Sequence, residues 1–286
     1  MSIYKRSDVK DKILQMYDEK LSSLNISFED IDVKTSYGNT HVIRTGNQEG
    51  KKLVIFHGIN AGAPIALEAI KELGDHYDLY AIDTIGQATK SDETILEIKD
   101  DSYAIWADEV VAGLGIEKAD FIGISYGAFI LQKLITHRPE RVGKCIFVVP
   151  SGLVNGKMFR SLIDLSLPLM KFLITKSDSN LKSFLKNFVP EDDTFMLRLQ
   201  REILLGVKMD YRRPQLLKAS DISHFSNPIY MIVADDDIFF PGDEAVKKAK
   251  IIFKNLQEVY FLPDCKHMPH ARDFPLIQSK LRSWLS

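Results

Sequence analysis

The feature of this chain that most constrains its fold is an alternation, from residue 53 onward, of short apolar runs with stretches of helical spacing. The apolar runs are residues 53–56, 79–82, 120–124, 145–149, 228–233 and 257–262. Apolar side chains recur at helical spacing in residues 64–73, 103–114, 126–137 and 242–253, and in a final stretch that ends near residue 285. Such an alternation indicates an α/β fold whose mainly parallel sheet is covered by helices on both faces.

Two segments depart from this alternation. Before it, residues 8–24 have the spacing of a helix, and residues 28–34 and 40–45 are strand-like runs joined by a hairpin turn. Within it, residues 151–222 contain no clear strand, and the helical pieces expected there are residues 157–174, 180–187 and 193–206. We therefore expect an α/β core made of residues 1–150 and 223–286, the N-terminal helix included, with residues 151–222 inserted as a helical lid.

The overall charge gives no sign of a polyanionic partner. Lys plus Arg number 37 and Asp plus Glu number 39, a formal net charge of −2, so we expect neither nucleic acid nor a membrane as a partner. The first residues have no apolar region typical of a signal peptide, and no apolar run reaches the roughly 18 residues of a spanning helix. We expect a cytoplasmic protein that is a monomer or a homodimer.

Patterns that bind cofactors or metals do not stand out. Cys145 and Cys265 are the only cysteines and form no Cys-x-x-Cys pair, and no Gly-x-Gly-x-x-Gly follows a strand. His267 and His270 have a spacing seen in metal sites, but no further pattern of His and carboxylate residues accompanies them. The sequence therefore predicts no cofactor and no metal.

The sharpest local signal is Gly-Ile-Ser-Tyr-Gly at residues 123–127, between a predicted strand and a predicted helix. A nucleophile elbow requires this strand–turn–helix, because its serine occupies a strained bend and the two glycines let strand and helix pass closely. The start of the helix also supplies unpaired N–H groups and the positive end of the helix dipole. This context predicts that Ser125 is a nucleophile.

A serine hydroxyl needs a base to take its proton and an acid to orient that base. After an elbow of this kind, the acid and the histidine are expected further along the chain, in that order. Asp235, Asp236 and Asp237 follow the strand 228–233, and His267 follows the strand 257–262. The order fits a Ser–Asp–His triad, and His270 remains a second candidate for the base.

The chain resembles the α/β-hydrolase fold family over about residues 28–286. Four motifs carry the resemblance: Phe-His-Gly-Ile-Asn at 56–60, the elbow at 123–127, Ala-Asp-Asp-Asp-Ile-Phe-Phe-Pro at 234–241 and His-Met-Pro at 267–269. Within the family, residues 83–91 and 239–242 are similar to bacterial carboxylesterases that cleave aryl-propionate esters. The resemblance implies a mostly parallel, eight-stranded sheet with helices on both faces and an inserted helical lid.

The resemblance also implies roles for individual residues. The register of the motifs makes Ser125, Asp237 and His267 the catalytic triad, with Asp235 as the alternative acid and Asp236 solvated. It assigns the oxyanion hole to the backbone N–H groups of Ile59 and Tyr126. The candidates for substrate binding are Asn60, Met158, Phe239 and Met268. In the lid, six apolar residues either line an acyl pocket or form the inner face of the lid: Met158, Phe159, Leu162, Leu167, Met170 and Phe172.

Together these features predict a serine hydrolase that cleaves small to medium carboxylic esters through an acyl-enzyme on Ser125. The alternatives are a C–C bond hydrolase, lactonase, thioesterase, amidase or cofactor-free perhydrolase on the same triad, or a non-catalytic ligand-binding member of the fold. Outside the triad, we expect His57 to be structural and Asp83 to fix its loop. Four histidines are expected at the surface or as helix caps: His41, His76, His137 and His224.

Overall fold

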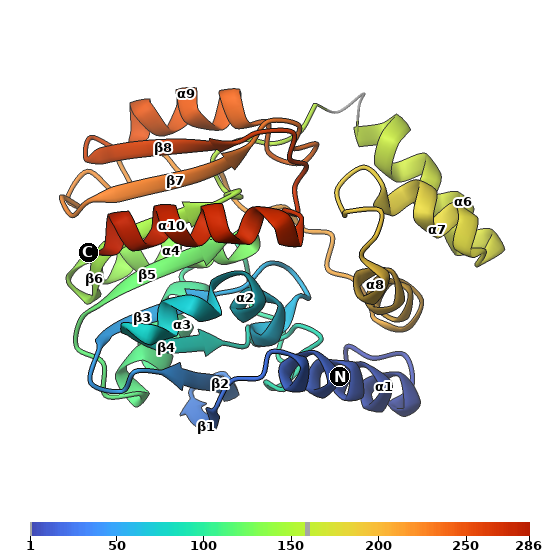
Figure 1. The fold of residues 1–286 in the computed structure, drawn as a ribbon, viewed down its shortest axis with the longest axis horizontal. Coiled ribbons are helices and arrows are strands. Elements are labelled where there is room, and N and C mark those ends of the chain that lie inside the picture. The colour runs from blue at the N-terminus through green and yellow to red at the C-terminus, as the bar shows by residue number, and fades with distance from the viewer. Residues whose placement is uncertain (1, 158–160) are drawn as a thin grey trace.

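The centre of the molecule is an eight-stranded sheet with the strand order β1-β2-β4-β3-β5-β6-β7-β8 (Figure 1). The computed structural model describes residues 2–157 and 161–286. The strands are β1 (Phe28–Thr35), β2 (Gly38–Gly46), β3 (Lys51–Phe56), β4 (Tyr77–Ile82), β5 (Ala119–Ile124), β6 (Val142–Val148), β7 (Ile229–Ala234) and β8 (Leu256–Leu262). β2 is antiparallel to β1 and β4, and all other neighbours are parallel. The expected mostly parallel, eight-stranded sheet is confirmed.

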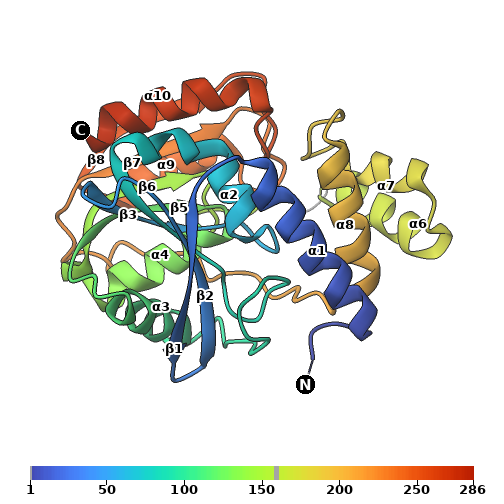
Figure 2. The same cartoon turned by 60° about the horizontal axis from the view of Figure 1, so that its bottom comes forward.

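Helices cover both faces of this sheet (Figure 2). One face is covered by α3 (Ser102–Gly113), α4 (Tyr126–His137) and α9 (Gly242–Ile252), and the other by α1 (Ser7–Ser23), α2 (Gly62–Ile70) and α10 (Phe274–Leu285). In β5, Phe121 faces the first group of helices and Ile122 the second, and both are fully buried. A strand buried on both faces has no polar side, which is why these strands are continuous apolar runs.

The parallel strands bring distant loops to one edge of the sheet. The loops after β3, β5, β7 and β8 hold residues 57–60, 125, 235–237 and 263–267, respectively. Because carboxyl ends of parallel strands meet at the same edge, the residues expected to do chemistry lie close together there.

Between β6 and β7 the chain forms a group of helices that is not part of the sheet. They are a π-helical turn η3 (Leu162–Ser166), α6 (Leu167–Thr175), α7 (Asp178–Leu185) and α8 (Thr194–Gly206). The side chain of Ser177 caps α7 by accepting from the Asn180 N–H, and Asp193 caps α8 by accepting from the Met196 N–H. These caps define where the two helices begin.

The helices of this segment extend to one side of the sheet, with α8 nearer the sheet and the α6–α7 pair beyond it (Figures 1 and 2). α1 packs on both the sheet and the helices of this segment. Its Tyr17 belongs to the apolar cluster between the sheet and α2, whereas its Ile13 belongs to the cluster that contains Ile203 of α8. Within the described residues, no helix is both long enough and apolar enough to cross a bilayer.

Candidate active site

The turn from β5 into α4 is a strained elbow with Ser125 at its bend. Ser125 has φ 51° and ψ −111°, a backbone conformation that a residue with a side chain rarely adopts. Its N–H donates to the Val148 carbonyl, and its own carbonyl accepts from the Ala128 N–H. A Cβ on Gly123 would lie 2.7 Å from the Ala128 Cα. The close approach of strand and helix therefore requires glycine at this position.

A chain of hydrogen bonds links Ser125, His267 and Asp237. His267 Nε2 lies 2.9 Å from Ser125 Oγ, and His267 Nδ1 lies 2.7 Å from Asp237 Oδ2. The other oxygen of Asp237 accepts from the N–H groups of Phe239 and Phe240 at 2.8 and 3.0 Å. A carboxylate held this way accepts the Nδ1 proton of His267, which leaves Nε2 as the acceptor for the serine proton.

The alternative acid and base lie elsewhere. Asp235 and Asp236 are exposed, whereas the Asp237 side chain is fully buried against the imidazole. His270 lies 3.7 Å from Asp192 of the inserted segment, and its N–H donates to Asp273 at the start of the last helical region. His267 therefore contacts both Ser125 and Asp237, whereas Asp235 is exposed to solvent and His270 lies beside Asp192.

The buried thiol of Cys265 lies two residues before His267 and its Sγ is 3.1 Å from the Lys266 carbonyl. Burial, with smaller contributions from nearby carboxylates, raises the pKa of this thiol to about 12. A thiol with a pKa this high stays protonated at neutral pH, and because the thiolate is the nucleophilic form of cysteine, Cys265 is not a nucleophile there.

The two backbone donors expected at the oxyanion hole belong to the first residue of α4 and to the loop after β3. Tyr126 is the first residue of α4, so its N–H has no acceptor within the helix. The loop after β3 passes close by, since a Cβ on Gly58 would lie 3.5 Å from the Ser125 Cβ. In that loop the Asn60 N–H donates to Gln87 Oε1, whereas the Ile59 N–H finds no acceptor in the described part of the chain.

His57 holds this loop from inside the protein. Its Nε2 accepts from the Thr84 N–H at 2.9 Å, so its Nδ1 carries the proton and donates to the Gly58 carbonyl at 2.6 Å. Complete burial lowers the pKa of His57, which keeps the imidazole neutral. His57 is therefore structural, as its position in the sequence motif predicts.

A buried charge network lies behind the same loop and was not foreseen. His41 is buried, with Nδ1 2.9 Å from Asp83 Oδ2 and Nε2 2.8 Å from Asp30 Oδ1. Asp83 also accepts from the Ala63 N–H at the start of α2, which fixes its loop as expected. The prediction of a surface or capping role is wrong for His41, because β1 and the loop after β4 cover it. His76, His137 and His224 are exposed.

Of the candidates for substrate binding, Phe239 and Met268 lie near His267, whereas Asn60 lies near Met209. The Phe239 ring lies 5.1 Å, centroid to centroid, from His267 and from Phe188 of the inserted segment. Met268 is packed in the same cluster, and its N–H donates to the Phe188 carbonyl. Asn60 is buried. Its side-chain oxygen accepts from the Ala88 N–H, and its side-chain nitrogen donates to the Met209 sulfur. Met158 falls outside the described residues.

Phe188 and Met209 were missed because no local pattern marks them. They come from the inserted segment, far along the chain from the loops they touch, and each follows a helix rather than a motif. The interpretation of the apolar lid residues was wrong in part. Leu162, Leu167 and Met170 do not form an inner face of the lid, because all three are exposed to solvent. Phe172 is fully buried, as an inner face requires, and Phe159 falls outside the described residues.

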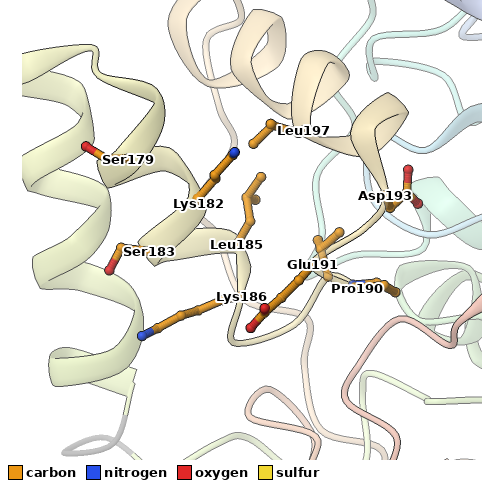
Figure 3. A pocket seen from close by; sticks show the side chains of 10 residues that line it. Ser179, Lys182, Ser183, Leu185, Lys186, Pro190, Glu191, Asp193 and Leu197 are labelled. Carbon is orange, nitrogen blue, oxygen red and sulfur yellow. The ribbon is translucent and has the colours of Figure 1, made fainter.

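A cavity of about 370 Å³ lies within the inserted segment, between α7 and α8 (Figure 3). Lys182 and Leu185 of α7 and Leu197 of α8 are among the residues around it. Its lining includes neither Ser125 nor His267 nor any residue of the loops around them. Within the described residues, no three His, Cys, Asp or Glu side chains gather so that they could hold a metal ion.

Comparison with known proteins places this geometry in a family. The family model of the alpha/beta hydrolase fold matches residues 51–273. The chain belongs to the α/β-hydrolase fold family. The expected resemblance to the family is confirmed, and the match covers the loops that hold Ser125, Asp237 and His267.

Several relatives within the family are bacterial carboxylesterases. An uncharacterized carboxylesterase of Bacillus subtilis (strain 168), nap, is 32% identical over 151 residues, which are 52% of this chain and half of that relative. Carboxylesterase YbfK of the same strain is 23% identical over 258 residues, 86% of this chain and 84% of the relative. The crystal structure of naproxen esterase (carboxylesterase NP) from Bacillus subtilis has a TM-score of 0.81 at 20% identity, with 99% and 100% of the two chains covered. This protein is an α/β-hydrolase that resembles bacterial carboxylesterases.

The elbow of this α/β-hydrolase leaves no room for a side chain at Gly127. A Cβ there would collide with the carbonyl oxygen of Phe56 in β3. We expect Gly127→Ala to lower the free energy of unfolding by about 3 kcal/mol or more, because backbone on both sides must move. Urea unfolding measures this. Gly115→Ala is the matched control: its φ is +67° with open space around it, so the cost is about 1 kcal/mol. Equal losses in the two variants would contradict the packing argument.

The network around His41 makes stability depend on pH. Burial alone would lower the pKa of His41, but its hydrogen bonds to Asp83 and Asp30 outweigh burial and raise the pKa. A raised pKa means that the folded state holds the proton more tightly. The contribution of His41 is therefore complete below the unfolded value of about 6.5 and is lost as pH rises through the folded value.

We expect the stability advantage of wild type over His41→Gln to be largest near pH 6 and to shrink toward about pH 9. Urea unfolding of both proteins across this pH range measures the advantage. The lowered pKa of His57 makes stability rise with pH in both proteins, and this effect cancels when one free energy of unfolding is subtracted from the other. Near the His41 ring stand Tyr17 of α1, whose hydroxyl is 3.5 Å away, and Lys90, 4.0 Å from Asp30. An advantage that does not change with pH would show that His41 is not protonated in the folded protein.

Proposed function

We propose that the protein is a serine hydrolase that cleaves small to medium carboxylic esters through an acyl-enzyme on Ser125. The observation that carries this proposal is the unbroken hydrogen-bond chain from Ser125 Oγ through His267 to buried Asp237. The resemblance to carboxylesterases supports an ester as the substrate. The apolar rings and thioether beside His267, from Phe239, Phe240 and Met268, favour an apolar acyl group.

In the proposed first half-reaction, Ser125 Oγ attacks the carbonyl carbon of the ester while His267 Nε2 takes the serine proton. The negative charge that develops on the carbonyl oxygen is held by the Ile59 and Tyr126 N–H groups, and one such donor contributes roughly 3 kcal/mol in other serine hydrolases. Asp237 stabilises the positively charged imidazole. The tetrahedral species then collapses, and the alcohol leaves with the proton from His267.

In the second half-reaction, water takes the place of the alcohol. His267 accepts a proton from the water, whose oxygen attacks the acyl carbon, and the same donors hold the oxyanion. Ser125 Oγ leaves with the proton from His267 and the carboxylic acid is released. All bonds made and broken are accounted for by one ester and one water molecule, and no cofactor is required.

Residues 151–222 act in this proposal as a cap on a core made of residues 1–150 and 223–286. The segment reaches the site at several points. The Ser151 hydroxyl donates to the Ser125 carbonyl at 2.9 Å, the Phe188 carbonyl accepts from the Met268 N–H, and the Met209 sulfur lies 3.7 Å from Asn60 Nδ2. Because this segment contacts both the loop that holds His267 and the loop that holds Ile59, we infer that it forms part of the acyl pocket.

A fluorophosphonate probe tests the proposal, because it labels only an activated serine. We expect wild type to be labelled and Ser125→Ala to remain unlabelled, with Ser179→Ala of α7 as a labelled control. An unlabelled wild type, or equal labelling of Ser125→Ala, would overturn the assignment of the nucleophile. A panel of p-nitrophenyl esters, thioesters, lactones and amides then separates the ester from the other substrates of the same triad.

A further inference from the structure

The outer face of η3 and α6 is an apolar stripe that nothing in the described part of the chain covers. Ile163, Leu167, Met170 and Ile174 follow one another at spacings of three and four residues, which places them on one side of a helix. Their exposed fractions rise from 45% at Ile163 to 78% at Ile174. Two more exposed residues flank them, so the outer stripe consists of Leu162, Ile163, Leu167, Met170, Leu173 and Ile174.

The other side of the same helix is apolar as well, but it is covered. Phe172 is fully buried, and Leu165 and Leu169 pack with it against the cluster that α1, α7 and α8 share. A helix that is apolar all round is found in a protein core or in contact with lipid, whereas a surface helix has a polar outer face. We therefore interpret the outer stripe as an interaction surface.

The contacts of α6 leave the outer stripe without a covering element in the described part of the chain. In Figure 2, α8 lies between the core and the α6–α7 pair. The side of α6 that contacts other helices already packs on α7. Because no described element covers the outer stripe, another molecule is the candidate for covering it.

The charge around the stripe differs from that of the whole protein. Residues 161–187 contain four lysines and two aspartates, a net charge of +2 in a chain whose net charge is −2. Lys171 lies four residues after Leu167 and three before Ile174, beside the stripe, and Lys176 follows the helix at once. Both are exposed, and no carboxylate in the described residues pairs with either, whereas Asp178 is paired with Arg201 at 2.7 Å.

We propose that the outer stripe docks the protein on an anionic lipid surface. The apolar side chains enter the boundary between head groups and acyl chains, while the lysines extend their ammonium groups to the phosphates. A second copy of the chain fits less well, because a symmetric contact through this stripe would bring two positively charged surfaces together. The overall charge of −2 conceals this feature, because the basic excess is confined to one segment.

Co-sedimentation with lipid vesicles tests the proposal. We expect the full chain to pellet with mixed phosphatidylcholine–phosphatidylglycerol vesicles, more weakly with phosphatidylcholine alone, and less as salt rises. Met170→Ser together with Ile174→Ser lowers the partition coefficient roughly tenfold or more. Neutralising Lys171 and Lys176 to Gln lowers binding to the mixed vesicles by about fivefold per lysine.

Matched controls separate this result from general stickiness and from catalysis. Ile251 of α9 is 70% exposed and distant from α6 in sequence and in the fold, so Ile251→Ser keeps wild-type binding. Ser125→Ala also binds as wild type, which makes failure of docking distinguishable from failure of the proposed catalysis. Wild type that stays in the supernatant overturns the proposal. So does a dimer that dissociates when Met170 and Ile174 are replaced, which would assign the stripe to a second copy.

Discussion

Ser125→Ala lowers kcat for ester hydrolysis by roughly 10⁶, and His267→Ala lowers it by a similar factor. Each change removes one member of a pair that acts only together: without the hydroxyl there is no nucleophile, and without the imidazole the hydroxyl keeps its proton. We therefore expect the double variant to be no slower than either single variant. The rate that remains above that in water comes from the oxyanion donors and from substrate binding.

Steady-state kinetics on one p-nitrophenyl ester, with circular dichroism to verify folding, measures this result. His270→Ala is the matched control, since it removes a histidine three residues away that contacts Asp192 rather than Ser125. Its kcat stays near that of wild type. Losses that multiply in the double variant, or a large loss in His270→Ala, would contradict the assigned pair.

Asp237→Asn lowers kcat by about 10⁴ and changes KM much less. The buried carboxylate accepts from the backbone N–H groups of Phe239 and Phe240 with one oxygen and from His267 Nδ1 with the other. An amide can keep the backbone bonds through its carbonyl, but its NH₂ then faces Nδ1 and favours the tautomer whose Nε2 carries a proton. In that tautomer His267 cannot take the serine proton.

Asp235→Asn is the control for this variant, because Asp235 belongs to the same loop and is exposed. Its kcat is expected to remain within about twofold of wild type, as for a surface charge that contacts no reacting group. If Asp235→Asn were the more damaging change, the acid would have been assigned to the wrong aspartate of the loop.

Local sequence patterns were sufficient for most of the fold. The central strands of the parallel part are buried on both faces, so they appear as apolar runs, and the helices between them have one apolar side. The edge strand β8 is largely exposed or half-buried and contains Gln257 and Glu258. The bend at Ser125 was also predictable, because only glycine at 123 and 127 allows β5 and α4 to approach as they do. Within 157–174, the expected helix divides into η3 and α6 in the described part.

The candidate site was predictable where it depends on motifs at the ends of parallel strands. Ser125, Asp237 and His267 each follow a recognisable strand, and the sheet brings those ends together. Phe188 and Met209 were not predictable, because each touches the site only through the way the inserted segment folds back over it. A similar reason explains His41, which is covered by the neighbouring strand β1 and by the loop after β4 that holds Asp83, 42 residues further along the chain.

The sequence by itself determined the alternation of strands and helices, the elbow, and the order of serine, aspartate and histidine along the chain. These depend on the intrinsic preferences of short segments and on which residues follow each strand. Only the tertiary structure decided which surfaces are covered. It buried His41 between Asp83 and Asp30, and it turned the stripe from Leu162 to Ile174 outward. An apolar face has the same pattern whether another element covers it or solvent does, because burial depends on neighbours that the segment itself does not encode.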